Sequence, residues 1–114
     1  MAITELYSGT EAVSTTEHSI TTDTAGPDAD TTDGVFQVFL DVSDMIAGDQ
    51  LQIRIYEKVR SGDTQRIVYE AILTGAQSQP IWVSPSLILM HGWDCTVDAL
   101  SGTITVNWSV RQVA

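Results

Sequence analysis

The chain has 114 residues, 43% of them hydrophobic, and fifteen acidic residues against five basic ones give a formal net charge of −10. The length fits one domain of common size, and the hydrophobic share is too high for a wholly disordered chain. The charge argues against a nucleic-acid backbone and an anionic membrane surface as partners, because both are bound by clustered Lys and Arg.

The single cysteine, Cys95, excludes an intrachain disulfide, so folding needs no oxidising compartment. The N-terminal residues lack the basic and apolar parts of a signal peptide, and no stretch approaches the about 18 apolar residues of a membrane helix. We expect a protein that is made in a cytosol and stays soluble.

Residues 1–34 differ from the rest, with twelve Ser or Thr, seven acids and no basic residue. One interpretation is a pair of weak edge strands, at residues 4–7 and 17–23, followed by a mobile loop. The other is an extended arm that orders only against a partner. Thr and Ile favour the strands. The expected organisation is an N-terminal arm over residues 1–34 and a β-sandwich domain over residues 35–114.

Residues 35–41 are almost entirely apolar, which is typical of a strand covered on both faces. The next segment, residues 42–49, is the only helix candidate, a single turn with Ser43 as N-cap and Gly48 as its end. Alternation over residues 51–59 and 66–73 predicts two paired strands with odd-numbered residues facing the core. That parity requires a connecting loop of three or five residues.

Two short strands are expected at residues 81–83 and 87–90, separated by Ser84-Pro85 at a bend or edge. A turn at Ser101-Gly102 predicts a final hairpin over residues 93–110. Its register pairs apolar with apolar residues on one face, for example Cys95 with Trp108. The fold class predicted is all-β: an antiparallel β-sandwich, jelly-roll-like or a small barrel, of seven to eight strands with at most one short helical turn.

Candidate catalytic and metal-binding groups are few. Cys95 with His18 or His91 could form a nucleophile and base, but Cys95 falls on the apolar face and is better explained as a small buried hydrophobic residue. Two histidines and one cysteine have no metal-ligand spacing. We therefore predict a protein without enzymatic activity, catalytic residues, cofactor or metal.

Two acidic patterns have simple interpretations. Asp28, Asp30 and Asp33 superficially resemble a calcium loop but miss its spacing, so a solvated acidic loop is the default interpretation. Asp94 and Asp98 are too far apart along a strand to act as a carboxylate pair, and Asp94 is expected to offset Arg111 across the hairpin.

Three segments resemble small virion proteins of tailed bacteriophages, the head decoration or cement proteins. They are residues 48–59 (GDQLQIRIYEKV), 91–96 (HGWDCT) and 107–111 (NWSVR), and the likeness spans roughly residues 35–112. This resemblance implies a virion protein on the outer capsid surface, made in the bacterial host cytoplasm. It would bind the major capsid protein, stabilise contacts between capsid subunits and self-associate, with a trimer favoured.

If the chain is a virion protein, the alternatives to a capsid decoration protein are a tail or neck component or a head fibre. A carbohydrate-binding β-sandwich module, which would need Trp82 and Tyr56 on one face, is the alternative of another class. Aromatic and arginine residues tend to dominate interfaces, so the expected partner-binding residues are Tyr56, Arg54 and Trp82, with Leu6 and Tyr7 on the N-terminal arm.

Overall fold

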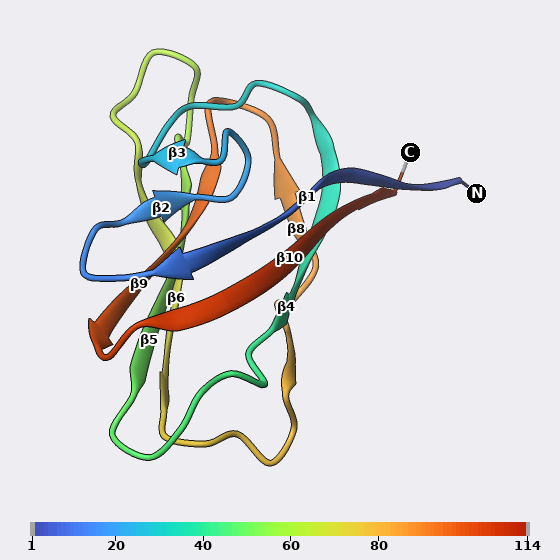
Figure 1. Ribbon diagram of the computed structural model, residues 1–114. Coiled ribbons are helices and arrows are strands. Elements are labelled where there is room, and N and C mark those ends of the chain that lie inside the picture. The colour runs from blue at the N-terminus through green and yellow to red at the C-terminus, as the bar shows by residue number, and fades with distance from the viewer. Residues whose placement is uncertain (1, 114) are drawn as a thin grey trace.

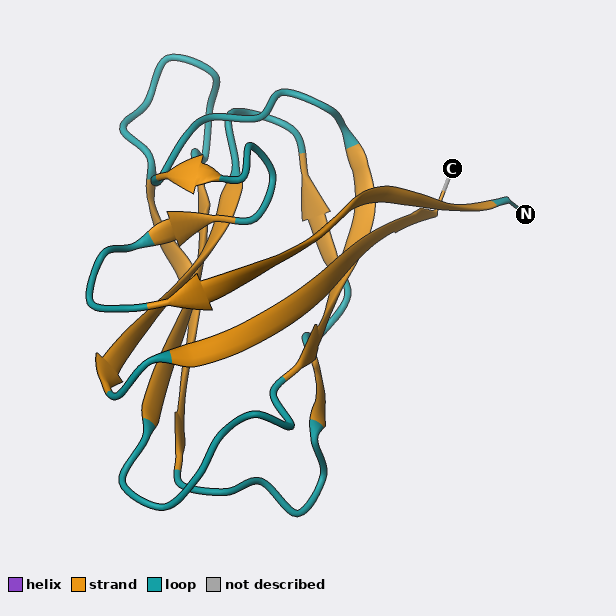
Figure 2. Cartoon of the chain, viewed as in Figure 1, coloured by secondary structure: helices purple, strands orange, loops and turns teal. Residues whose placement is uncertain are grey.

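The computed structural model describes residues 2–113, which fold into ten β-strands joined by loops and turns (Figures 1 and 2). The strands are β1 (Ile3–Val13), β2 (His18–Ser19), β3 (Thr24–Ala25), β4 (Gly34–Asp41), β5 (Gln50–Glu57), β6 (Arg66–Thr74), β7 (Ile81–Val83), β8 (Leu87–Leu89), β9 (Asp94–Ser101) and β10 (Ile104–Val113). No helix long and apolar enough to cross a membrane occurs in the described part of the chain.

The strands form two antiparallel sheets of five strands each. Sheet A has the order β1-β10-β4-β7, with β8 also paired to β4, and sheet B has the order β3-β2-β9-β5-β6. If β7 and β8 are counted as one interrupted strand, and β2 and β3 as one short hairpin, this is the strand order of an eight-stranded jelly roll. The predicted antiparallel sandwich is confirmed.

The first 34 residues are built into both sheets. β1 pairs with β10 from Ile3 to Val13, and β2 pairs with β9. Val13 and Ile20 are each 1% exposed and belong to the same hydrophobic core as the later strands. The segment predicted as an arm thus supplies an edge of each sheet, and Figure 1 shows the two termini side by side at the end of the β1–β10 ribbon.

The predicted hairpin between residues 93 and 110 is wrong in its pairing. β9 lies between β2 and β5 in sheet B, whereas β10 lies between β1 and β4 in sheet A. Cys95 and Trp108 are both buried, as predicted, but they come from opposite sheets of the sandwich. The alternation of apolar residues predicts which face of a strand is buried. It does not predict the neighbouring strand, because strands of both sheets bury their apolar faces in the same core.

The β5–β6 pair is confirmed, with a correction to its loop. Leu51 pairs with Leu73 and Ile55 with Tyr69, in the predicted parity, but eight residues (58–65) connect the strands. The prediction that Val59 and Ile67 face the core is wrong, because Val59 lies in this loop and is 86% exposed, and Ile67 lies beyond the shift in register and is 47% exposed. The register shifts next to Ile55, where Val68 is the extra residue of a β-bulge. Beyond this extra residue, the numbers of two paired residues add up to an odd number, so the connecting loop can contain an even number of residues.

The segment 42–49 contains turns and no helix. The carboxylate of Asp41 accepts a hydrogen bond from the backbone N–H of Ser43, and Asp49 accepts one from Ile46. Gly48 adopts a φ of 92°, in the region that favours glycine. Ser43 is therefore not an N-cap.

Candidate functional site

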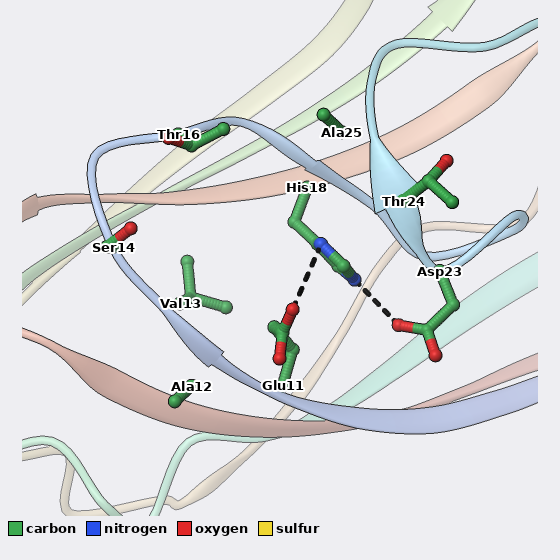
Figure 3. Close-up of a pocket in the computed structure, with 9 residues that line it drawn as sticks. All are labelled: Glu11, Ala12, Val13, Ser14, Thr16, His18, Asp23, Thr24 and Ala25. Carbon is green, nitrogen blue, oxygen red and sulfur yellow. Dashed lines mark hydrogen bonds and ion pairs between the residues drawn. The ribbon is translucent and has the colours of Figure 1, made fainter.

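A pocket of about 280 Å³ lies on the open side of the sandwich, between the edge strand of sheet A and the short hairpin of sheet B (Figure 3). Its wall comes from the end of β1, from β2 and β3, and from the turns that join them. The residues that line it are Glu11, Ala12, Val13, Ser14, Thr16, His18, Asp23, Thr24 and Ala25.

His18 is at the centre of this pocket, and a carboxylate faces each of its two ring nitrogens (Figure 3). Glu11 Oε2 lies 3.5 Å from Nδ1, and Asp23 Oδ1 lies 2.8 Å from Nε2. Strand geometry explains this meeting. Glu11 lies opposite the buried Val106, so it is on the inner side of β1 and faces the imidazole across the gap between the sheets.

The indole of Trp108 lies beside His18, with the two ring centroids 5.6 Å apart. The indole packs against Gly9, which is two residues before Glu11 on the same face of β1, so closely that a Cβ at Gly9 would lie 2.5 Å from Trp108 Cζ2. Trp108 Nε1 is buried and has no acceptor among the described residues.

The chemistry open to this pocket is limited. Since both ring nitrogens of His18 face carboxylates, neither is placed to take a proton from a hydroxyl such as that of Ser14. The thiol of Cys95 is fully buried, and this burial raises its pKa far above its ordinary value, so a nucleophilic thiolate is disfavoured. Among residues 2–113, Glu11, His18 and Asp23 are the one group whose donor atoms converge closely enough to hold a metal ion.

The acids of the suspected calcium loop do not converge. Asp28 accepts hydrogen bonds from Thr22 and Thr24, and Asp30 from the hydroxyl of Tyr7, while Asp33 offers its backbone oxygen to another strand.

The residues predicted to bind a partner are distributed over different parts of the fold. Arg54 and Tyr56 lie on the outer face of sheet B, where Arg54 pairs with Glu70 at 2.9 Å. The hydroxyl of Tyr56 donates to Glu17, and burial together with this hydrogen bond raises the pKa of Tyr56. Tyr56 is only 9% exposed, so it offers little surface to a ligand.

The other three predicted residues lie elsewhere. Trp82, in β7 at the edge of sheet A, packs against the core and contacts Tyr69 across the sandwich, with ring centroids 6.3 Å apart. Leu6 and Tyr7, in β1, also pack against the core. Trp82 and Tyr56 therefore belong to different sheets and form no common aromatic platform.

The outer face of sheet B is polar yet largely buried. Asp94 is fully buried and accepts hydrogen bonds from Ser19, Thr21 and the backbone N–H groups of Asp28 and Cys95. Burial raises the pKa of Asp94, although these hydrogen bonds oppose the shift. Asp94 therefore ties the chain on both sides of β3, at Ser19, Thr21 and Asp28, to β9 and does not offset Arg111 as the sequence suggested.

Asp98, on the same face, has an Oδ1 atom that is buried without a partner among the described residues. Burial raises the pKa of Asp98, and the charge of Arg54 opposes the shift. The two aspartates look equivalent in the sequence, but the buried oxygens of Asp94 accept hydrogen bonds and the buried Oδ1 of Asp98 does not.

The outer face of sheet A carries an exposed aliphatic row, formed by Ile3, Val113, Val35 and Ile88. Backbone pairing places these residues directly beside one another across β1, β10, β4 and β8. Ile3 is 69% and Ile88 78% exposed. Next to the row, the guanidinium of Arg111 lies 3.8 Å from the ring centroid of Phe39, and a shallow groove runs between them and the row.

Neither the pocket nor the aliphatic row could be recognised from sequence spacing. Glu11 and His18 meet because β1 is an edge strand of sheet A and β2 lies next to the edge strand of sheet B. The four residues of the row come from four strands that are scattered along the chain. The order of the strands decides both features, and local spacing does not contain it.

No protein-family model and no curated protein matches this chain. Two solved structures are similar in fold. The crystal structure of PirA has a TM-score of 0.52 at 10% identity, covering 93% of this chain and 92% of that chain. A protein of the Bacillus endospore appendages, which form a family of disulfide-linked pili, has a TM-score of 0.50 at 10% identity, covering 98% of this chain and 85% of that chain. At such identity the likeness concerns the fold alone.

Proposed function

We propose that this chain is a non-enzymatic structural protein of a virion, a capsid decoration protein that docks on the major capsid protein through the outer face of sheet A. The observation that carries the proposal is the aliphatic row. Four neighbouring aliphatic residues on the outside of a sheet are a continuous apolar strip, and such strips on soluble proteins commonly mark interaction sites.

The surroundings of the row suit a protein partner. Arg111, stacked on Phe39, is an arginine held over an aromatic ring beside an apolar strip, and arginine and aromatic residues are enriched at the centres of interfaces. The net charge of −10 disfavours DNA as the partner, which agrees with a place on the outside of a head. The sequence resemblance to decoration proteins supplies the identity of the partner.

One of the two fold neighbours belongs to disulfide-linked pili, but at 10% identity this likeness concerns the fold and does not carry the proposal. Disulfide linkage of the kind reported for those pili is not supported for this chain. Its single cysteine, Cys95, is fully buried within sheet B, so it cannot reach a second copy without unfolding. Self-association, with a trimer favoured, would have to be non-covalent.

The alternatives differ in what they require. A tail, neck or head-fibre component would use the same apolar face on another virion protein. A carbohydrate-binding module needs exposed aromatic residues on one face, and Tyr56 and Trp82 do not supply it.

The test is co-sedimentation of the purified protein with expanded heads and with procapsids of the phage that carries the gene. We expect saturable binding to expanded heads, because a protein that stabilises the mature lattice must bind it more tightly than the immature one. Replacing Ile88 with Asp should weaken binding about 10- to 100-fold, from the about 1.5 to 3 kcal/mol of burying one large aliphatic side chain.

The matched control is Val59→Asp, which makes the same change of charge at a residue that is 86% exposed in the β5–β6 loop. Its binding should remain that of the wild type. Failure of the wild-type protein to bind either form of the head would refute the decoration function. Equal loss in the two variants would refute the assignment of the docking face. Deletion of the N-terminal residues is not a usable test, since it removes β1 from sheet A.

A further inference from the structure

We propose that the pocket between β1 and β2 binds a divalent transition-metal ion, with Glu11 and His18 as its protein ligands and Asp23 as the carboxylate that orients the imidazole. This site is separate from the docking face, because Glu11 lies on the inner side of β1 whereas the aliphatic row lies on the outside of sheet A.

The first argument concerns charge. A neutral imidazole has one N–H group and one lone pair, whereas a carboxylate only accepts hydrogen bonds. In this pocket a carboxylate faces each ring nitrogen of His18, so each nitrogen needs either a proton or a metal ion between it and its carboxylate. The pocket lining contains no Lys or Arg that could neutralise the two carboxylates. Two carboxylates and one imidazole therefore converge without a basic side chain among the residues that line the pocket.

The two distances divide the roles of the carboxylates. Asp23 Oδ1 lies 2.8 Å from Nε2, which is an ordinary hydrogen-bond length. Glu11 Oε2 lies 3.5 Å from Nδ1, which is long for a hydrogen bond. It is close to the about 3.4 Å that separates two ligands of a tetrahedral ion with bonds of about 2.1 Å. An ion between Nδ1 and Glu11 would leave Asp23 accepting the Nε2–H group, the usual arrangement of a metal-bound histidine.

The donor set favours a particular class of ion. Imidazole nitrogen with carboxylate oxygen suits Zn²⁺ and its neighbours Co²⁺, Ni²⁺ and Cu²⁺, whereas Ca²⁺ and Mg²⁺ take sets made of oxygen. The pocket volume of about 280 Å³ leaves room for water molecules to complete the coordination.

A neighbouring feature is Trp108, whose ring centroid lies 5.6 Å from that of His18. Its Nε1–H group is buried, and no residue of the described chain accepts a hydrogen bond from it. A buried donor without an acceptor costs about 1 to 3 kcal/mol, so such donors usually have a partner. The indole ring that carries this donor is the one that lies beside His18.

The experiment uses the full chain and Zn²⁺, with calorimetric titration at pH 7.5 and nitrogen-detected NMR of the two histidine rings. We expect Zn²⁺ to bind at one site, to shift the ring resonances of His18 and not those of His91, and to raise the melting temperature. Mg²⁺ at the same concentration should not shift the ring resonances of His18 and should not raise the melting temperature. Addition of Cu²⁺ should quench the fluorescence of Trp108, because its ring lies 5.6 Å from the imidazole.

Variants then test the separate roles. Glu11→Gln should abolish measurable binding of Zn²⁺. Asp23→Asn should weaken the affinity about tenfold, since loss of the partner that orients a metal-bound histidine typically lowers metal affinity about 10- to 100-fold. His91→Ala is the control and should bind as the wild type does. The NMR titration of the wild-type protein does not depend on whether any variant folds.

Three results would overturn the proposal. The first is a wild-type protein whose His18 resonances do not respond to Zn²⁺. The second is a ring that carries protons on both nitrogens at pH 7.5 and keeps them when Zn²⁺ is added, which would show that a proton fills the position. The third, equal loss of affinity in Glu11→Gln and Asp23→Asn, would overturn the division of roles. None of these results bears on docking to heads, so the two proposals fail separately.

Discussion

Replacement of Asp94 by Asn tests whether one buried carboxylate holds the chain on both sides of β3, residues 19–28, onto β9 of sheet B. The two side chains have nearly the same shape, but Asn must place an NH₂ group where one carboxylate oxygen stood. If this group replaces Oδ2, it faces the backbone N–H of Asp28, which now donates to Oδ2 at 2.7 Å. If it replaces Oδ1, it faces Ser19, Thr21 and the N–H of Cys95. In both orientations at least one donor meets another donor.

The magnitude follows from the hydrogen bonds that are lost. A bond to a charged group contributes about 1.5 to 3 kcal/mol, and an unsatisfied buried donor costs about 1 to 3 kcal/mol. Removing a buried charge opposes this loss, and the raised pKa of Asp94 shows that burial does penalise its ionised form. We expect a net loss of about 2 to 3 kcal/mol at pH 7, which lowers the melting temperature of a domain of this size by about 10 °C.

The assay is thermal and urea unfolding followed by circular dichroism, with Asp98→Asn as the matched control. Asp98 lies on the same face of the same strand, but its Oδ1 has no partner among the described residues. Asp98→Asn should therefore be neutral or slightly stabilising. An equal loss in the two variants, or a change below about 2 °C for Asp94→Asn, would refute this reasoning about the polar face.

Three further experiments test the titration of Asp98, the packing of Gly9 and the burial of Cys95. The first compares Asp98→Asn with the wild type at pH 4 and 7. Because burial raises the pKa of Asp98 above 3.8, the folded protein binds that proton more tightly, and stability should fall as the pH rises from about 4 through the raised pKa. Asp98→Asn removes this pH-dependent contribution to stability. The melting temperature of the variant should therefore rise relative to that of the wild type between pH 4 and 7. A difference that stays constant over this range would contradict the raised pKa of Asp98. Gly9→Ala should cost about 1 to 3 kcal/mol in urea unfolding because its Cβ would overlap the ring of Trp108, whereas Gly62→Ala, which has open space around its Cβ, should not. Cys95 should react with a maleimide only after unfolding, and rapid labelling of the native protein would show that β9 opens.

The alternation of apolar residues was enough to predict the class of fold and most of the buried positions. Leu51, Ile53 and Ile55 are buried as predicted, and so is Cys95. A strand has only two faces, and the buried one must be apolar, so this pattern is local and can be read from one sequence.

Pairing between strands could not be predicted in the same way. Cys95 and Trp108 suited a hairpin register, yet the chain crosses from sheet B to sheet A after Gly102, whose φ of 84° suits a tight turn of either kind. The bulge at Val68 similarly depends on packing against β5, and no residue type in the sequence marks it. Interactions between distant segments decide both features.

The candidate sites depend on the same long-range information. His18 resembled an isolated histidine in the sequence, and only the closure of two sheets brings Glu11 and Asp23 to its ring. Tyr56 alternates with apolar residues along its strand, a pattern that places it on the outer face of the sheet. It is buried because neighbouring polar side chains, including that of Glu17, cover the outer face of sheet B. Surface exposure cannot be read from alternation when a polar face packs against its own loops.

The central claim is that the outer face of sheet A docks on the capsid. An electron cryomicroscopy map of expanded heads decorated with the purified protein tests this claim most directly, because the two faces of a jelly roll can be told apart once the strands are resolved. The account predicts that Ile88, Val35 and Ile3 face the major capsid protein, with sheet B on the side of the domain away from the capsid. A map in which sheet B contacts the capsid, or in which the heads carry no density for this protein, would contradict it.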